Sequence, residues 1–166
     1  MKIYTKKGDE GQTDLLNKRV SKADLHIEVN GVLDEAMAFL LMAKHYMRVT
    51  EVLDDIDQIH DNLYQLAYEI ALDNPKKQII KEGNVLWLES RLDHYDSFLE
   101  PLTRFIKLDQ TKAASWLNLA RVTIRRAERH LVLLNLEQEI NPFTMAYVNR
   151  LSDYLFTVAR YFDEVK

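Results

Sequence analysis

The residues best suited to chemistry lie near the start of the chain, where two glycines alternate with hydroxyl and ammonium side chains. Residues 5–13 read TKKGDEGQT. This composition allows backbone N–H groups to close around phosphate oxygens while the lysines offset their charge. The segment is neither a Walker loop, because no GxxxxGK(S/T) occurs, nor a GxGxxG dinucleotide fingerprint. Taken alone, it is also consistent with a mobile polar tail that contains a turn.

A second charged group lies in the C-terminal half and comprises Arg121, Arg125, Arg126, Glu128 and Arg129. Arg121, Arg125 and Glu128 each follow an inward-facing position of a predicted helix, so they border its apolar stripe. A guanidinium at such a border is satisfied either by carboxylates of neighbouring helices or by a bound polyphosphate, which it grips in bidentate fashion. Spacing alone leaves a structural ion-pair face and a phosphate site both open.

Two further polar groups accompany apolar stripes. Residues 149–153 (NRLSD) place polar side chains closely around one inward leucine, and Asp34 and Glu35 lie at the edge of an earlier stripe. Such a cluster is often a buried hydrogen-bond network. Acids at a stripe edge are more often solvated than catalytic, and spacing does not decide either case.

The sequence predicts no metal-ligating residues. A di-iron bundle needs paired Glu-x-x-His motifs, and the closest approach here is Asp57-x-x-His60. Cysteine is absent, which removes thiolate ligands and a thiol nucleophile. The other four histidines, like His60, are interpreted as surface or packing residues: His26, His45, His94 and His130.

The elements that must position these groups are helices. Only four glycines and three prolines occur, and apolar residues recur at three- and four-residue steps after position 23. The expected helices run from about 24 to 47, from about 53 to 73, from 81 or 83 to 98, from a cap at 109 or 111 to beyond 134, and from 141–142 onward. This predicts one all-α domain over 1–166: an irregular segment at 1–23 and a five-helix bundle at 24–166.

Charge and hydropathy exclude several classes of protein. A net charge of −4, from 26 acids and 22 bases, argues against a broad nucleic-acid interface. No apolar run approaches the ~20 residues that cross a bilayer, so no membrane partner is expected. The lack of cysteine favours a cytoplasmic location.

Six stretches together resemble one family. They are YTKKGDEGQT at 4–13, RVSKAD at 19–24, VNGVLDE at 29–35, FI at 105–106, ARVTIRRAER at 120–129 and NRLSDYLFTVAR at 149–160. Read in this order, the chain resembles PduO-type ATP:cob(I)alamin adenosyltransferases. The resemblance implies transfer of the 5′-deoxyadenosyl group of ATP to Co(I) of reduced cobalamin, which releases triphosphate.

The resemblance also implies site residues and partners. Asp34 and Arg121 would pair across a subunit boundary beside the corrin, and Phe105 would press on its lower face. The chain would form a homotrimer and receive Co(I) from a reductase. The residues expected around ATP and Mg²⁺ are Thr5, Lys6, Lys7, Gly8, Thr13, Asp14, Lys22, Arg125, Arg126, Glu128, Arg129 and Asn149.

Departures from the family pattern gather on the cobalamin side. Residues 107–110 (KLDQ) stand where the family usually has Leu-Pro-Gly-Gly, and Asn118 stands where it has histidine. Trp116 replaces a small residue, and His26 replaces an arginine. These changes leave a second hypothesis: an ATP-binding homologue that has lost cobalamin activity and acts as a sensor, carrier or partner subunit.

Overall fold

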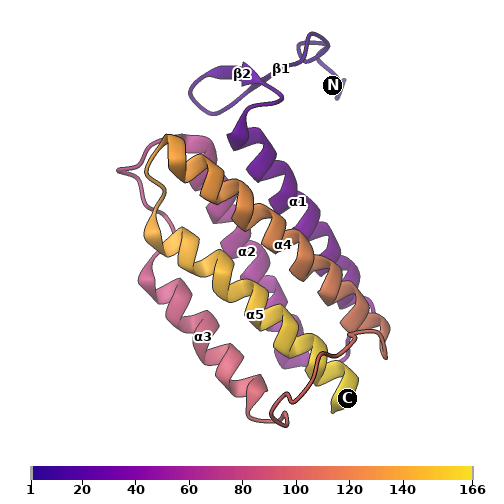
Figure 1. Cartoon of the computed structure of the whole chain (residues 1–166). Helices are drawn as coiled ribbons and strands as arrows, with labels where there is room; N and C mark the ends of the chain where they lie inside the picture. The colour runs from indigo at the N-terminus through magenta and orange to yellow at the C-terminus, as the bar shows by residue number, and fades with distance from the viewer. Residues whose placement is uncertain (1, 166) are drawn as a thin grey trace.

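A computed structural model describes residues 2–165 and confirms the predicted all-α five-helix bundle (Figure 1). The helices are α1 (Leu25–Lys44), α2 (Thr50–Leu72), α3 (Glu82–Asp96), α4 (Lys112–Glu137) and α5 (Pro142–Glu164). The predicted second helix begins a turn earlier than its first inward leucine because Thr50 and the residues after it continue the helical pattern. The other helices lie close to where the sequence predicts them.

The helix ends follow from local chemistry. The side chain of Thr111 accepts a hydrogen bond from the backbone N–H of Ala114 (3.1 Å), so the cap of α4 is Thr111 and not the alternative, Asp109. Asn141 caps α5, which begins with Pro142, a residue that lacks the N–H that a first turn leaves unpaired. Helix α2 ends at Asp73, which adopts the left-handed conformation (φ 48°).

Consecutive helices of the bundle run in alternating directions, so α3 and α5 run the same way (Figure 1). Helix α1 packs on α2 and α4, α4 packs also on α5, and α5 packs on α3. The predicted inward stripe of α4 is fully buried at every position, and its members are Leu117, Ala120, Ile124, Ala127, Leu131 and Leu134. Helix α4 therefore has one face in the core, which leaves the neighbouring arginines at its border.

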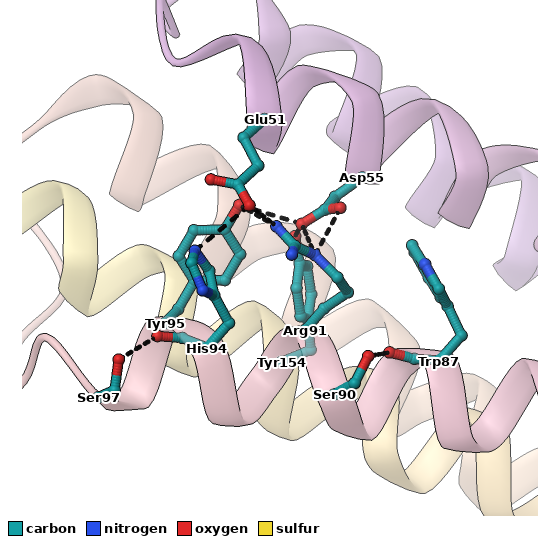
Figure 2. A network of polar contacts seen from close by, with 9 residues as sticks. All are labelled: Glu51, Asp55, Trp87, Ser90, Arg91, His94, Tyr95, Ser97 and Tyr154. Atoms are coloured by element: carbon teal, nitrogen blue, oxygen red, sulfur yellow. Dashed lines mark hydrogen bonds and ion pairs between the residues drawn. The ribbon is translucent and has the colours of Figure 1, made fainter.

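A buried polar cluster joins α2, α3 and α5 (Figure 2). The carboxylate of Asp55, only 6 % exposed, accepts hydrogen bonds from Arg91 Nε (2.8 Å), Tyr95 Oη (3.0 Å) and Tyr154 Oη (3.0 Å). Arg91 also donates to Glu51 (2.6 Å). Burial, together with the charge of Asp55, raises the pKa of Tyr95 and Tyr154, so both hydroxyls keep the protons they donate.

The segment before α1 is not wholly irregular, which corrects the prediction for 1–23. Strands β1 (Gln12–Asp14) and β2 (Arg19–Ser21) form an antiparallel hairpin in which Thr13 pairs with Val20. The backbone N–H of Leu15 donates to the carbonyl of Lys18 (2.8 Å) and closes the loop. Leu15 and Val20 are buried, so the hairpin rests on the end of the bundle (Figure 1). Residues 2–23 are called the leader below.

Across residues 2–165, no helix combines the length and the apolar character needed to cross a lipid bilayer.

Candidate functional site

The leader folds its glycine-rich segment into a tight turn against Lys22. The N–H of Gly11 donates to the carbonyl of Gly8 (3.2 Å), and Lys6 adopts a left-handed conformation (φ 60°). A Cβ atom at Gly8 would lie 3.2 Å from the Lys22 ammonium, so a larger residue would displace that group. Glycine thus lets the Lys22 ammonium approach the turn, and the side chains of Lys6 and Lys7 are exposed beside it.

Arg19 braces this turn, a role that the sequence reasoning missed. Its guanidinium donates to Asp14 Oδ1 (2.8 Å) and to the carbonyl of Lys7. Arg19 is not among the residues expected around ATP, but it connects two that are, Asp14 and Lys7. The signal was present, because Arg19 opens the RVSKAD stretch, but nothing in the spacing showed what it would contact.

The charged residues between positions 121 and 129 of α4 are called the charged row below: Arg121, Arg125, Arg126, Glu128 and Arg129. Two of them bind residues of neighbouring helices. Arg126 forms an ion pair with Glu35 of α1, and Glu128 accepts a hydrogen bond from Asn149 Nδ2 of α5 (2.9 Å). Arg129 donates to the carbonyl of Arg125 (3.1 Å). Within residues 2–165 the Arg125 guanidinium makes no hydrogen bond or ion pair, and it is exposed. The charged row is therefore a structural ion-pair face only in part, because Arg126 is paired and Arg125 is not.

Arg121 is a half-buried cation whose contacts are neutral. Its Nε donates to Asn118 Oδ1 (2.9 Å), and its guanidinium carbon lies 5.9 Å from the centre of the Phe156 ring. Burial, and then the nearby positive charge of Arg125, lower the pKa of Arg121. No carboxylate of residues 2–165 pairs with it. A guanidinium stays charged in proteins, so this site favours an anion supplied from outside the chain.

Asp34 lies elsewhere, in a groove of about 550 Å³ between α1 and α2. The groove is lined by Tyr64 and Tyr68, which are 66 % and 51 % exposed. The side-chain oxygen of Asn30 is buried beside it without a hydrogen-bond partner among residues 2–165. Asp34 thus faces α2 while Arg121 faces α5, so the two predicted partners do not pair within one chain.

The structure brings the predicted residues into separate groups. Among residues 2–165, no hydrogen bond or ion pair links the leader to Arg125, Arg126 or Arg129. Glu128 and Asn149 meet, and the leader residues meet one another. A site that uses all of these groups requires a bound ligand, a second chain or both to bring them together.

Sequence comparison identifies the family. The family model for cobalamin adenosyltransferase matches residues 3–162. A corrinoid adenosyltransferase of Bacillus subtilis (strain 168) is 36% identical over 165 residues, which cover 96% of this chain and 86% of that protein. The chain belongs to the cobalamin adenosyltransferase family. This confirms the predicted resemblance and the predicted enzyme class, an ATP-dependent corrinoid adenosyltransferase.

Other family members agree. The corrinoid adenosyltransferase PduO of Salmonella typhimurium is 37% identical over 165 residues, which cover 96% of this chain but only 49% of that protein, about half of its length. A variant of the PduO-type ATP:corrinoid adenosyltransferase from Lactobacillus reuteri, complexed with cobalamin and ATP, has a TM-score of 0.89 at 33% identity and covers 98% of this chain and 91% of that chain. A second variant, complexed with ATP, has a TM-score of 0.88.

Two of the residues that depart from the family pattern, Leu108 and Trp116, pack into the bundle in this member of the cobalamin adenosyltransferase family. Leu108, within the segment that replaces the glycine turn, is buried, and Asp163 of α5 accepts from the Thr111 N–H (2.8 Å) just beyond it. Trp116 packs beside Phe39 of α1, with ring centres 6.0 Å apart and the ring planes inclined at 32°. Phe105 remains fully exposed. Leu108 and Trp116 therefore have packing partners, whereas Lys107, Asp109 and Gln110 are exposed, and the Phe105 ring is free to contact a ligand.

Proposed function

We propose that this chain transfers the 5′-deoxyadenosyl group of ATP to the Co(I) atom of a reduced corrinoid. A cobalt electron pair forms the bond to C5′ while the bond from C5′ to the triphosphate oxygen breaks, and that oxygen keeps its electron pair. Cobalt is thereby oxidised to Co(III). Family membership supports the reaction. The observation that carries it in this chain is Arg121, a half-buried cation with no anionic partner among residues 2–165.

The nucleotide binds between the leader and the charged row of α4 in this proposal. Triphosphate leaves with a large negative charge, and preorganised cations are the groups that stabilise such charge. The ATP-contacting residues are Thr5, Lys6, Lys7, Gly8, Thr13, Asp14 and Lys22 of the leader, with Arg125, Arg126, Glu128, Arg129 and Asn149 of the bundle. ATP enters as its Mg²⁺ complex, because Mg²⁺ is commonly held by substrate phosphates together with one or two carboxylates.

The corrin binds at a boundary between two copies of the chain. Asp34 and Arg121 face different helices within one chain, so an Asp34–Arg121 pair is possible only between protomers. This supports the proposed homotrimer with active sites between subunits. The exposed Phe105 ring supplies an apolar wall that excludes a lower axial ligand from cobalt and favours reduction to Co(I).

The location and remaining partners are also proposals. We place the enzyme in the cytoplasm, where a reductase supplies the electron that converts Co(II) to Co(I). The net charge of −4 and the lack of a membrane-crossing helix in residues 2–165 are compatible with this assignment.

The decisive experiment is anaerobic incubation of the purified chain with chemically reduced cobalamin and MgATP, followed by spectroscopic detection of adenosylcobalamin. We expect product from the native chain and at least a tenfold lower rate from Arg121→Ala, because it removes a charge-assisted contact on the order of 2 kcal/mol. Lys76→Ala, an exposed residue in the turn after α2, is the control and should keep the native rate.

Failure to form product under strongly reducing conditions would contradict the proposed reaction. Calorimetry then separates the alternatives. Binding of MgATP without binding of cobalamin would favour the homologue that has lost cobalamin activity.

A further inference from the structure

A cluster of charged side chains fastens the leader to the bundle at the end opposite its glycine turn. Lys18, in the hairpin loop, forms an ion pair with Asp73 at the end of α2 (2.7 Å). The neighbouring Asn17 donates its side-chain N–H to the carbonyl of Leu72 (3.1 Å). These two contacts come from adjacent residues of one loop. The hairpin is thus held at its loop, and the turn that carries Lys6 and Lys7 extends beyond it.

His26 lies at the centre of this cluster. The residue is 6 % exposed, and each ring nitrogen faces a different carboxylate. Nδ1 lies 2.8 Å from Asp24 Oδ1, and Nε2 lies 3.0 Å from Asp73 Oδ1. Asp24 precedes α1 and Asp73 follows α2. The ring therefore bridges the segment that leaves the leader and the residue to which the leader loop is attached.

The distances indicate which protonation state this arrangement favours. A neutral imidazole carries one N–H, and only the imidazolium donates from both nitrogens. Burial acts to raise the pKa of Asp73, but its bond to Lys18 and the charge of His26 outweigh it and lower that pKa. The pKa of Asp24 is lowered, despite burial, by its bonds from His26. Both ring nitrogens lie within hydrogen-bond distance of a carboxylate oxygen, an arrangement in which an imidazolium can use both of its donors.

The side chain of Gln138, beyond the end of α4, is the remaining group at this ring, and as placed its amide nitrogen lies 2.9 Å from Nε2. Its amide oxygen accepts from a protonated Nε2 in one orientation, and its amide nitrogen donates to a neutral Nε2 in the other. The titratable groups that face the ring are Asp24 and Asp73, with Lys18 paired to Asp73. Behind Asp73, a small cavity is also lined by Glu69, Lys77 and Glu139.

We propose that His26 is a positioning residue, which as an imidazolium bridging Asp24 and Asp73 holds the leader in the orientation that binds ATP. The inference rests on the proposed role of the leader in nucleotide binding. His26 touches no reacting atom. It acts through Asp73, to which Lys18 attaches the hairpin loop, and through Asp24, which caps α1 directly after the leader.

The bridge makes leader order dependent on pH in both directions. Asp24 and Asp73 have lowered pKa values, so their contribution is present above their unfolded pKa and is lost as the pH falls through their folded values. A ring that has lost one of its two protons donates from one nitrogen only, so the bridge then loses one of its two bonds. Leader order and ATP affinity should therefore be greatest between these two limits.

The test compares His26→Arg with His26→Gln in the full chain. Arginine keeps a cation at every accessible pH, and glutamine keeps a polar side chain without charge. MgATP affinity is measured by calorimetry at about pH 6 and about pH 9. Between these two pH values the MgATP affinity of the native chain should fall about tenfold more than that of His26→Arg. This factor is smaller than the one expected for the loss of a full charge-assisted hydrogen bond. His26→Gln should bind weakly at both values. The arginine variant has the same other titrating groups as the native chain and binds the same ATP. A difference between their pH profiles therefore comes from residue 26.

A second measurement needs no nucleotide. Protection of the Leu15 and Lys22 amides from hydrogen exchange reports leader order, because both N–H groups are bonded within the leader, to Lys18 and Gly11. Protection should fall about tenfold in His26→Gln and be retained in His26→Arg. The ring ¹⁵N shifts of His26 should show two protonated nitrogens at about pH 6.

Three outcomes would overturn the inference: a neutral ring at about pH 6, equal protection in the native chain and His26→Gln, or the same pH profile in the native chain and His26→Arg. Failure of the proposed function has a different signature. If the chain does not bind MgATP at any pH, but amide protection still depends on His26, the anchor stands and the nucleotide role of the leader is wrong.

Discussion

Two arginine sites in this molecule differ in what surrounds the charge. Arg91 of α3 meets Glu51, Asp55 and Tyr95, and its charge is fully compensated inside the bundle (Figure 2). Arg121 of α4 meets an amide oxygen and an aromatic ring, although it too is partly buried. Burial acts to lower the pKa of both, but the carboxylates around Arg91 outweigh it and raise the pKa there, whereas Arg121 keeps a lowered pKa.

The difference separates charges that serve the fold from charges that are available to a ligand. A buried ion pair with full partners is costly to break, so the cluster around Asp55 connects three helices in one arrangement. Partial burial of a cation without a carboxylate partner is unfavourable when no ligand is bound. An anion that binds beside the cation offsets this cost. The α4 row therefore has the electrostatic character of a binding site, and the Asp55 cluster has that of a structural connection.

The largest expected effect is on stability, and it comes from removing the buried carboxylate that binds Arg91. Asp55→Asn removes the carboxylate that accepts from Arg91, Tyr95 and Tyr154, and it should lower the free energy of unfolding by about 3 kcal/mol, at the lower end for loss of one partner of a buried pair. Asp54→Asn changes the adjacent exposed acid and should stay within about 0.5 kcal/mol of the native chain. Urea denaturation measures both. Equal stability of the two variants would contradict a structural role for the cluster.

A smaller effect, on binding instead of stability, is expected on α4. Arg125→Ala should weaken MgATP binding by about 2 kcal/mol, the value of a charge-assisted hydrogen bond, because its guanidinium has no partner within residues 2–165. Its unfolding free energy should change by less than about 0.5 kcal/mol, as for other exposed sites. Calorimetry and urea denaturation give the two values. A loss of stability with unchanged ATP affinity would move Arg125 into the structural class.

The smallest effect is expected at Arg126, which forms an ion pair within the chain and also belongs to the proposed ATP site. Arg126 pairs with Glu35 although both side chains are more than 40 % exposed, and such pairs contribute less than about 1 kcal/mol. A double-mutant cycle with Glu35→Gln and Arg126→Gln should therefore give a small coupling energy that decreases with salt. In the proposed site Glu35 would compete with phosphate for Arg126, so Glu35→Gln should not weaken MgATP binding. Weaker binding would show that Glu35 positions Arg126 instead.

The sequence predicts the bundle well because helix packing is periodic. The inward stripe of α4 follows from three- and four-residue spacing, and the ends of α5 and α2 follow from Asn141-Pro142 and the approach to Pro75. The Asp55 cluster was not predicted because its carboxylate resembles an ordinary surface acid in an acidic stretch. Its partners Arg91 and Tyr154 lie 36 and 99 residues away in sequence, and no local pattern connects them.

The candidate site was predictable in part for a related reason. Local groups are visible in sequence, such as the leader turn and the charged row of α4. Contacts between elements are not, as shown by the Arg19 brace and by His26, which was interpreted only as a packing or surface residue. The hairpin was missed because its strands have three residues each and only one buried side chain, Val20, between them.

One property of α4 would set the relative placement of the two substrates in the proposed site. The helix has 26 residues and a rise of about 1.5 Å per residue, so Arg121, Arg125 and Arg129 succeed one another at intervals of about 6 Å along one rod. In the proposed site, a corrin near the first of these residues and a phosphate chain near the others would be spaced by the rise of the helix. A bend of the helix between these residues would then change the distance between cobalt and C5′ in the proposed site, so this distance would depend on backbone geometry as well as on side chains.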